Sequence, residues 1–130
     1  MKYLSDYMEK KQSDLFKKTG TFFAFSNKRF EEKADKKIEY VSLGSGMITP
    51  KENANEVIEQ LHKIYKDSIK KDIKENGKDA VILRELHNHE AFYVGNIEDT
   101  IEKLKDYPIT EDDINNIYSK NYSEVVELYH

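Results

Sequence analysis

The feature that most constrains the fold is a long run of apolar residues at helical spacing in the middle of the chain. Apolar side chains recur every three or four positions, at Ala54, Val57, Ile58, Leu61, Ile64, Tyr65, Ile69 and Ile73. This spacing is typical of an amphipathic α-helix. The preceding Thr49-Pro50-Lys51-Glu52 resembles a helix start, because threonine caps, proline suits the first turn and glutamate completes a capping box. Asn76-Gly77 marks the predicted end.

The predicted length of this helix limits how it can pack. At ~1.5 Å per residue, the helix would be about 40 Å long. The whole chain has 130 residues, the size of one ordinary domain, and we predict a single domain over residues 1–130. Because the helix exceeds the diameter of such a domain, we expect it to kink or to project. Its projecting half is then available to a partner or to a second copy of the chain, as in a homo-oligomer.

The remaining elements are shorter. Helices are predicted over residues 3–20 and from 26 or 27 to about 36, with strands over 21–26 and 38–43 that are expected to pair. Gly44-Ser45-Gly46 is expected to be a turn rather than a phosphate-binding loop. Residues 79–91 fit either a helix or a hairpin with its tip at His87-Asn88 and its second arm over 91–94, and their Leu, Arg and Glu content favours the helix. Two further helices are predicted from Asn96 and from Thr110. The predicted fold is α+β and mainly helical, with five or six helices, one of them long, around a small two-stranded β-element.

Composition excludes several classes of function. The net charge is −4, from 25 acidic and 21 basic residues, and the two signs are interleaved, so we do not expect nucleic acid as a partner. The chain has no cysteine, which excludes disulfides and thiol chemistry. No apolar run has the length of a signal peptide or a membrane span. A cytoplasmic protein that does not enter the membrane is therefore expected.

The densest group of polar residues is Glu85-Leu86-His87-Asn88-His89-Glu90. Two histidines and two carboxylates are suited to binding a divalent metal or to acid–base catalysis. His87 and His89 are two residues apart, which places them on different sides of a helix and does not match the spacing of helical zinc sites. Glu85 and His89, by contrast, form an i, i+4 pair.

Two interpretations of this segment remain open. In the favoured one, His89 is buried and paired with Glu85 or with a backbone carbonyl, and the other polar side chains face solvent. In the other, His87 and His89 are metal ligands, and the third ligand comes from elsewhere, with His62 as the only other interior histidine. The candidate binding residues are Glu85, His87, Asn88, His89 and Glu90.

The long predicted helix also carries a stripe of lysines at spacings of three and four. Such a stripe is able to contact phosphates or an acidic partner. Acidic residues lie beside it, as in the i, i+4 pair of Glu59 and Lys63, so a solvated face with ion pairs is the favoured interpretation. The candidate binding residues of the stripe are Lys63, Lys66, Lys70 and Lys74.

Three segments resemble stretches of uncharacterised small proteins from phages, plasmids and conjugative elements of low-GC Gram-positive bacteria. They are Arg84-Glu85-Leu86-His87-Asn88-His89-Glu90-Ala91-Phe92-Tyr93-Val94-Gly95-Asn96-Ile97-Glu98-Asp99, Phe23-Ala24-Phe25-Ser26-Asn27-Lys28 and Leu43-Gly44-Ser45-Gly46. The resemblance implies a mobile-element setting, in which small accessory proteins often bind a host component. The resemblance does not indicate any particular enzymatic activity.

These observations lead to two hypotheses about function. The leading one is a non-catalytic accessory protein of a mobile genetic element that binds a host protein, for instance to inhibit a host defence system as an anti-CRISPR does. It requires no cofactor. The alternative is a small enzyme that uses a divalent metal held by Glu85, His87, His89 and Glu90.

Overall fold

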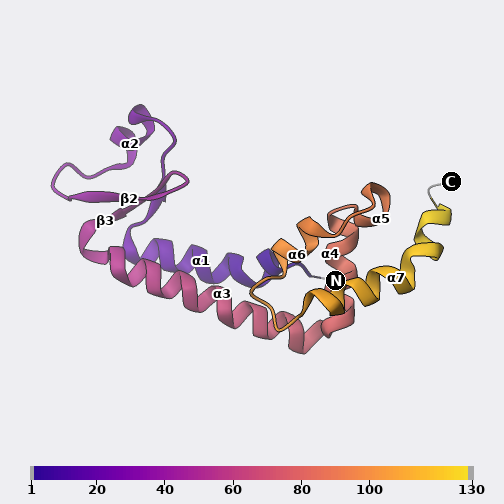
Figure 1. Ribbon diagram of the computed structural model, residues 1–130. Helices are drawn as coiled ribbons and strands as arrows, with labels where there is room; N and C mark the ends of the chain where they lie inside the picture. The colour runs from indigo at the N-terminus through magenta and orange to yellow at the C-terminus, as the bar shows by residue number, and fades with distance from the viewer. Residues whose placement is uncertain (1, 129–130) are drawn as a thin grey trace. The chain divides into compact units, whose positions relative to one another are not determined.

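The chain forms two compact units in the computed structural model, which describes residues 2–128 and the side chains of residues 2–122. The first unit is Lys2–Ser68 and the second begins at Ile69. The division falls within the long helix α3, Ala54–Asn76, which contributes its first part to one unit and its last part to the other (Figure 1). The prediction of a single domain over residues 1–130 stays a prediction.

The first unit opens with the helix α1, Leu4–Thr19. It ends where the sequence predicts, because Gly20 adopts a left-handed φ of 75° and its backbone N–H donates to the carbonyl of Phe16. The short helix α2, Asn27–Lys33, is also confirmed, with the Ser26 hydroxyl accepting a hydrogen bond from the Arg29 amide.

A three-stranded antiparallel sheet follows, rather than the predicted two-stranded element. Its strands are β1, Phe22–Phe23, β2, Tyr40–Gly44, and β3, Met47–Pro50, in the order β1-β3-β2. The two predicted strands therefore do not pair with each other, because β3 lies between them. Thr49, the predicted helix cap, is instead a strand residue with no exposed surface, and its hydroxyl lies 2.9 Å from that of Thr21. That capping prediction was wrong.

The turn between β2 and β3 is confirmed. Ser45 and Gly46 form a two-residue loop with φ values of 52° and 78°. Positive φ at both positions is characteristic of a type I′ turn, which matches the twist of the strands it joins. The Gly-Ser-Gly segment thus serves a hairpin.

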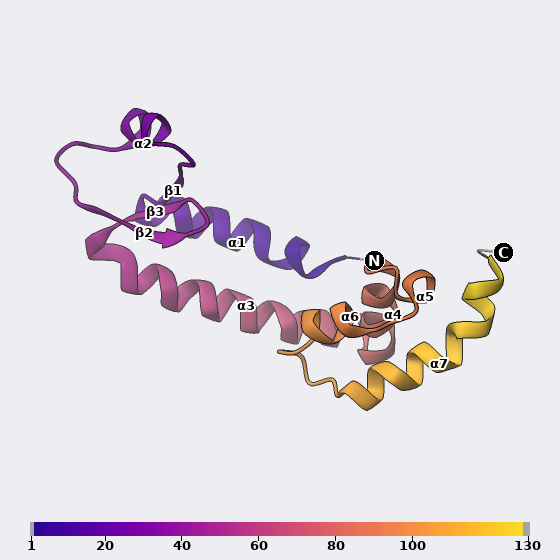
Figure 2. The ribbon, with the colours of Figure 1, turned by 45° about the horizontal axis from the view of Figure 1, so that its top comes forward.

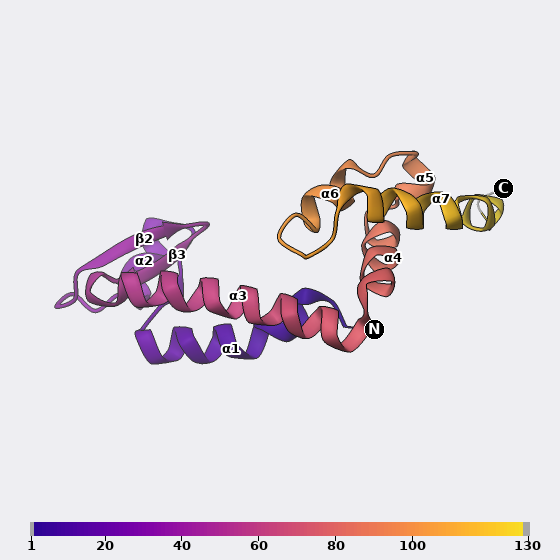
Figure 3. The same ribbon diagram turned by 60° about the horizontal axis from the view of Figure 1, so that its bottom comes forward.

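The helix α3 starts after a 3₁₀ turn at Lys51–Asn53 and ends at Asn76, as predicted. Its first part lies beside α1, and both helices run away from the sheet (Figures 2 and 3). Apolar side chains from both helices are buried in this unit: Leu4, Tyr7, Leu15, Val57 and Ile64. The first unit is thus a helix pair with a small sheet at one end.

The second unit contains the end of α3 and four more helices. They are α4, Lys78–Asn88, α5, Ala91–Val94, α6, Glu98–Lys103, and α7, Glu111–Leu128. The helical interpretation of residues 79–91 is confirmed up to Asn88, and the helix predicted from Thr110 starts with a capping box between Thr110 and Asp113. The main buried side chains are Val81, Ile82, Leu86, Phe92, Leu104 and Ile114.

The far part of α3 is packed rather than bare. Ile69 is only 5% exposed and Asp72 is fully buried. The expectation that this half of the helix projects without packing was therefore wrong. The fold class is confirmed: a mainly helical α+β protein with one long helix and a small sheet. None of the helices that the structure describes is long and apolar enough to cross a membrane.

Candidate functional site

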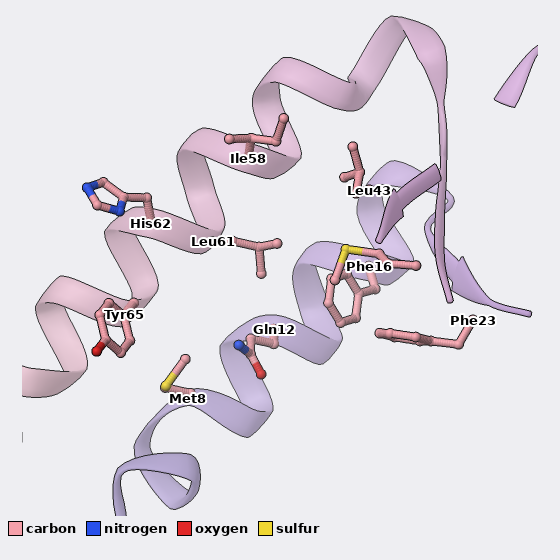
Figure 4. A pocket seen from close by; sticks show the side chains of 10 residues that line it. Met8, Gln12, Phe16, Phe23, Leu43, Ile58, Leu61, His62 and Tyr65 are labelled. Carbon is pink, nitrogen blue, oxygen red and sulfur yellow. The ribbon is translucent and has the colours of Figure 1, made fainter. Parts of the chain in front are cut away.

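A groove of about 650 Å³ runs along one face of the first unit (Figure 4). Three sources supply its lining: one row of side chains on α1, one face of α3 and the three strands of the sheet. The lining residues are Met8, Gln12, Phe16, Phe23, Leu43, Met47, Ile58, Leu61, His62 and Tyr65. We refer to this set as the apolar groove.

Helical periodicity explains why these residues share a face. Met8, Gln12 and Phe16 are four residues apart on α1, so they form one row along the helix. Ile58, Leu61 and Tyr65 occupy the corresponding i, i+3, i+7 positions of α3. Figure 4 shows Leu61 pointing from α3 toward α1.

The sheet closes one end of the groove. Phe23, Leu43 and Met47 come from β1, β2 and β3 in turn. The ring of Phe23 packs edge-on against that of Phe16, with centroids 5.5 Å apart. The aromatic wall of the groove is therefore fixed by a contact between α1 and the sheet.

The apolar groove is uncharged and uncovered. None of its ten residues is Lys, Arg, Asp or Glu, and none of them is buried. Ile58 keeps 52% of its surface exposed and Phe23 keeps 37%. Covering a fully exposed side chain of this kind stabilises a complex by roughly 1.5–3 kcal/mol. The groove thus leaves a favourable interaction unmade.

The other face of the same helix pair has the opposite character. It carries Lys11, Asp14 and Lys18 from α1, and Gln60, Lys63 and Asp67 from α3. Lys18 also forms an ion pair of 3.2 Å with Glu56. Charges of both signs thus cover one side of the pair, and the apolar groove occupies the other.

Sequence reasoning identified the apolar stripe of the long helix but not this groove. The available signal was the width of the stripe. Val57 and Ile64 lie on one edge of it and are buried, whereas Ile58 lies on the other edge and is exposed. A single neighbouring helix covers only part of so wide an arc.

A buried cluster of charges lies in the second unit. The guanidinium of Arg84 donates to both oxygens of Asp72, at 2.8 and 2.9 Å, and to Glu85 at 2.7 Å. The hydroxyl of Tyr107 donates to Asp72 at 2.6 Å, and the Asn76 amide donates at 2.8 Å. We call Asp72, Arg84, Glu85 and Tyr107 the charge cluster.

Titration behaviour follows from this geometry. Burial alone would raise the pKa of the Asp72 carboxyl, but hydrogen bonds from Arg84, Tyr107 and Asn76 outweigh burial and hold that pKa below its ordinary value. Burial and the adjacent Asp72 carboxylate raise the pKa of the Tyr107 hydroxyl. Asp72 and Arg84 are therefore both charged at neutral pH and hydrogen-bonded to each other, which is a structural role.

The structure separates the residues of the predicted polar segment. Glu85 points inward, with 2% of its side chain exposed, and belongs to the charge cluster. His89 is its i, i+4 neighbour, and the His89 Nε2 lies 3.9 Å from the Glu85 Oε1. His87 is exposed, with its ring 5.3 Å from that of Phe92, and Asn88 and Glu90 are exposed as well.

A metal site gains no support from these positions. Among the side chains that the structure describes, no three His, Asp or Glu gather in a way that could hold a metal ion. His62, the third ligand that the sequence offered, belongs to the first unit. The four candidate lysines, Lys63, Lys66, Lys70 and Lys74, are all exposed along α3.

Comparison with known proteins places the chain in a family. The family model matches residues 4–125, which is most of the chain. The chain belongs to DUF7659, a family of unknown function. No curated protein and no solved structure matches it. Function therefore has to be argued from the sites of this chain.

Proposed function

We propose that the protein acts by binding another protein through the apolar groove. The observation that carries this proposal is that ten adjacent side chains form an uncharged face and that all ten stay at least partly exposed. Exposed apolar patches on small proteins are commonly sites of interaction with other macromolecules.

The residue types of the groove suit this role. Phe16, Phe23 and Tyr65 supply large rigid surfaces of the kind that dominates binding energy at interfaces. Met8 and Met47 supply flexible side chains that adapt to the shape of a partner. Among the ten residues only His62 and Tyr65 carry groups used in acid–base catalysis, and no carboxylate lies in the set.

The partner is proposed to be a host protein in the cytoplasm. This part rests on the resemblance of three segments to proteins of phages, plasmids and conjugative elements. Inhibition of a host defence system, as by an anti-CRISPR, is the most specific form of the proposal. The metal-dependent alternative has less support, because the Glu85 carboxylate accepts a hydrogen bond from Arg84.

A pair of charge substitutions on α3 tests the proposal. Ile58 is in the groove and 52% exposed, whereas Gln60 lies two residues away on the charged face and is also exposed. We expect Ile58→Asp to weaken capture of a host partner by about tenfold or more, because the partner would bury an unpaired carboxylate. Gln60→Asp introduces the same charge and is expected to leave capture unchanged.

The measurement is quantitative mass spectrometry of proteins retained by the tagged full chain from a nuclease-treated Gram-positive lysate. Far-UV circular dichroism of both variants checks that the fold is retained. Equal capture by the two variants would mean that the partner binds outside the groove. If the native chain retains no partner, the proposal fails.

A further inference from the structure

We infer that the apolar groove accepts an α-helix of the partner, whose contact face is apolar and uncharged. The inference rests on the proposed function and names the class of partner for the same site. It follows from the backbone, the spacing and the size of the groove.

The backbone of the groove walls favours a helix over an extended peptide. Two walls are α-helices, whose amide and carbonyl groups are already paired along their length. An extended peptide would bury its own backbone groups there without hydrogen-bond partners, which is costly. A helix brings those groups already paired.

The sheet has two edge strands, β1 and β2, and at the β1 edge an added strand would meet an existing contact. β1 is a two-residue edge strand, and the carbonyl of Phe23 already accepts a hydrogen bond from the Lys33 ammonium at 2.8 Å. Adding a further strand beside Phe23 would have to displace this contact. Strand pairing at this edge is therefore less favourable.

The spacing of the lining fits a helix of a few turns. The row from Met8 to Phe16 spans nine residues, and its ends are about 12 Å apart along α1. Its partner row on α3 runs from Ile58 to Tyr65. A third helix lying between the two rows would present side chains at i, i+3, i+4 and i+7, the pattern used when a helix binds a groove.

Charge and size define the occupant further. Besides sulfur, the polar atoms of the lining side chains are confined to Gln12, His62 and Tyr65, so an acidic or basic side chain inserted here would lack an opposite charge. The groove offers ten residues, whereas a stable protein–protein interface uses roughly 20–30 residues a side. The groove is thus of a size to contact one helix, and a homodimer would need further surface outside it.

The methionines give direct probes of this site. The chain contains three methionines, and Met8 and Met47 lie at opposite parts of the groove lining. Labelling with ¹³C-methyl methionine makes both visible by NMR in the intact chain. The ligand is a synthetic peptide of about 14 residues with Leu and Met at i, i+3, i+4 and i+7, and the control peptide has the same composition rearranged to a period of two.

We expect the helical peptide to shift both methyl signals and to gain helical circular dichroism on binding. The rearranged peptide is expected to leave both signals in place. Ile58→Asp should weaken binding of the helical peptide by about tenfold or more, and Gln60→Asp should not.

Other outcomes separate this inference from the proposed function. If the rearranged peptide shifts the methyls as strongly, the groove binds protein but not specifically a helix, and only the inference falls. If the two methyl signals of the protein alone move with its concentration, a second copy fills the groove and the inference is likewise wrong. If neither peptide shifts them, the inference falls, and the capture experiment decides the proposed function separately.

Discussion

The apolar groove and the charge cluster distribute polarity in opposite ways. In the second unit, Asp72, Arg84 and Glu85 are buried, and each carboxylate is hydrogen-bonded to the guanidinium. In the first unit, apolar side chains such as Ile58 and Phe23 remain at the surface. One region buries charge, and the other exposes hydrocarbon.

The difference shows which region is available to a ligand. Asp72 accepts hydrogen bonds from three side chains, and Arg84 uses its donors on two carboxylates, so the cluster has little capacity left for an external group. The groove, by contrast, is available to a ligand, because its apolar surface is stabilised only when another molecule covers it. The uncovered groove thus supports the proposed binding function, and the charge cluster stabilises the fold of the second unit.

The largest effect is expected from removing the centre of the charge cluster. Arg84→Met leaves two buried carboxylates without their cation, and we expect a loss of about 3–5 kcal/mol in the free energy of unfolding. Urea unfolding followed by far-UV circular dichroism at pH 7 measures it. The chain has one other arginine, the exposed Arg29, and Arg29→Met should stay within roughly 0.5 kcal/mol of the native chain.

A small loss in the free energy of unfolding of Arg84→Met would contradict the structural role given to the charge cluster. If it cost no more than Arg29→Met, the cluster would not hold the second unit together, and its buried charges would need another explanation. If Arg84→Met fails to fold at all, Arg84→Lys provides a measurable variant, because a lysine keeps the charge but loses the two-oxygen contact with Asp72.

A smaller effect is expected on acidification. The pKa of Asp72 is lower in the folded chain than its ordinary value of 3.8, so its carboxylate contributes stability that is present above pH 3.8 and is lost as the pH falls through the folded value. Asp113 titrates in the same range, because hydrogen bonds from Lys78 and from the Thr110 amide lower its pKa to about 2. The effect stays below that of Arg84→Met, since protonation neutralises one carboxylate whereas that substitution leaves two without their cation.

The measurement is the urea midpoint between pH 7 and pH 2.5 in an Asp113→Asn background. Adding Asp72→Asn should make the midpoint fall less steeply below pH 4. An unchanged slope would show that Asp72 has the same pKa in the folded and unfolded chain.

Much of the fold was predictable because local signals and tertiary contacts agree. Gly20 ends α1, and Thr110 with Asp113 starts α7, through contacts within a few residues. The strand β3 was missed because Thr49-Pro50-Lys51-Glu52 satisfies the local pattern of a helix start. Thr49 and Pro50 are held in the strand by pairing with Val41 and Tyr40 of β2, across the Ser45-Gly46 turn.

The two sites were less predictable for different physical reasons. Asp72 falls within the apolar stripe of α3, three residues after Ile69, and this misplaced carboxylate was a usable signal of a buried ion pair. Its partner Tyr107 is 35 residues away, and the apolar periodicity of α3 gives no information about contacts at that separation. For the groove, periodicity indicates which residues are apolar and leaves open whether another element covers them.

The smallest effect concerns the hairpin that positions one end of the groove. Gly46 has a φ of 78°, and a Cβ added there would lie 2.5 Å from the Phe25 ring. Gly95 has the same φ, with no atom within 4 Å of its added Cβ. Gly46→Ala and Gly95→Ala should each lose about 1–2 kcal/mol from the left-handed backbone, and Gly46→Ala should lose more because of the ring.

Urea unfolding of the two variants measures the difference, and the Met47 methyl signal reports whether the groove end moves with it. Phe25 is 73% exposed, so its ring has room to swing away. Equal losses and an unshifted Met47 signal would mean that it does so freely and that the groove is insensitive to the turn. A larger loss in Gly46→Ala that disappears when Phe25→Ala is added would show that the ring resists displacement. In that case the hairpin, like the charge cluster, is held by contacts within the chain.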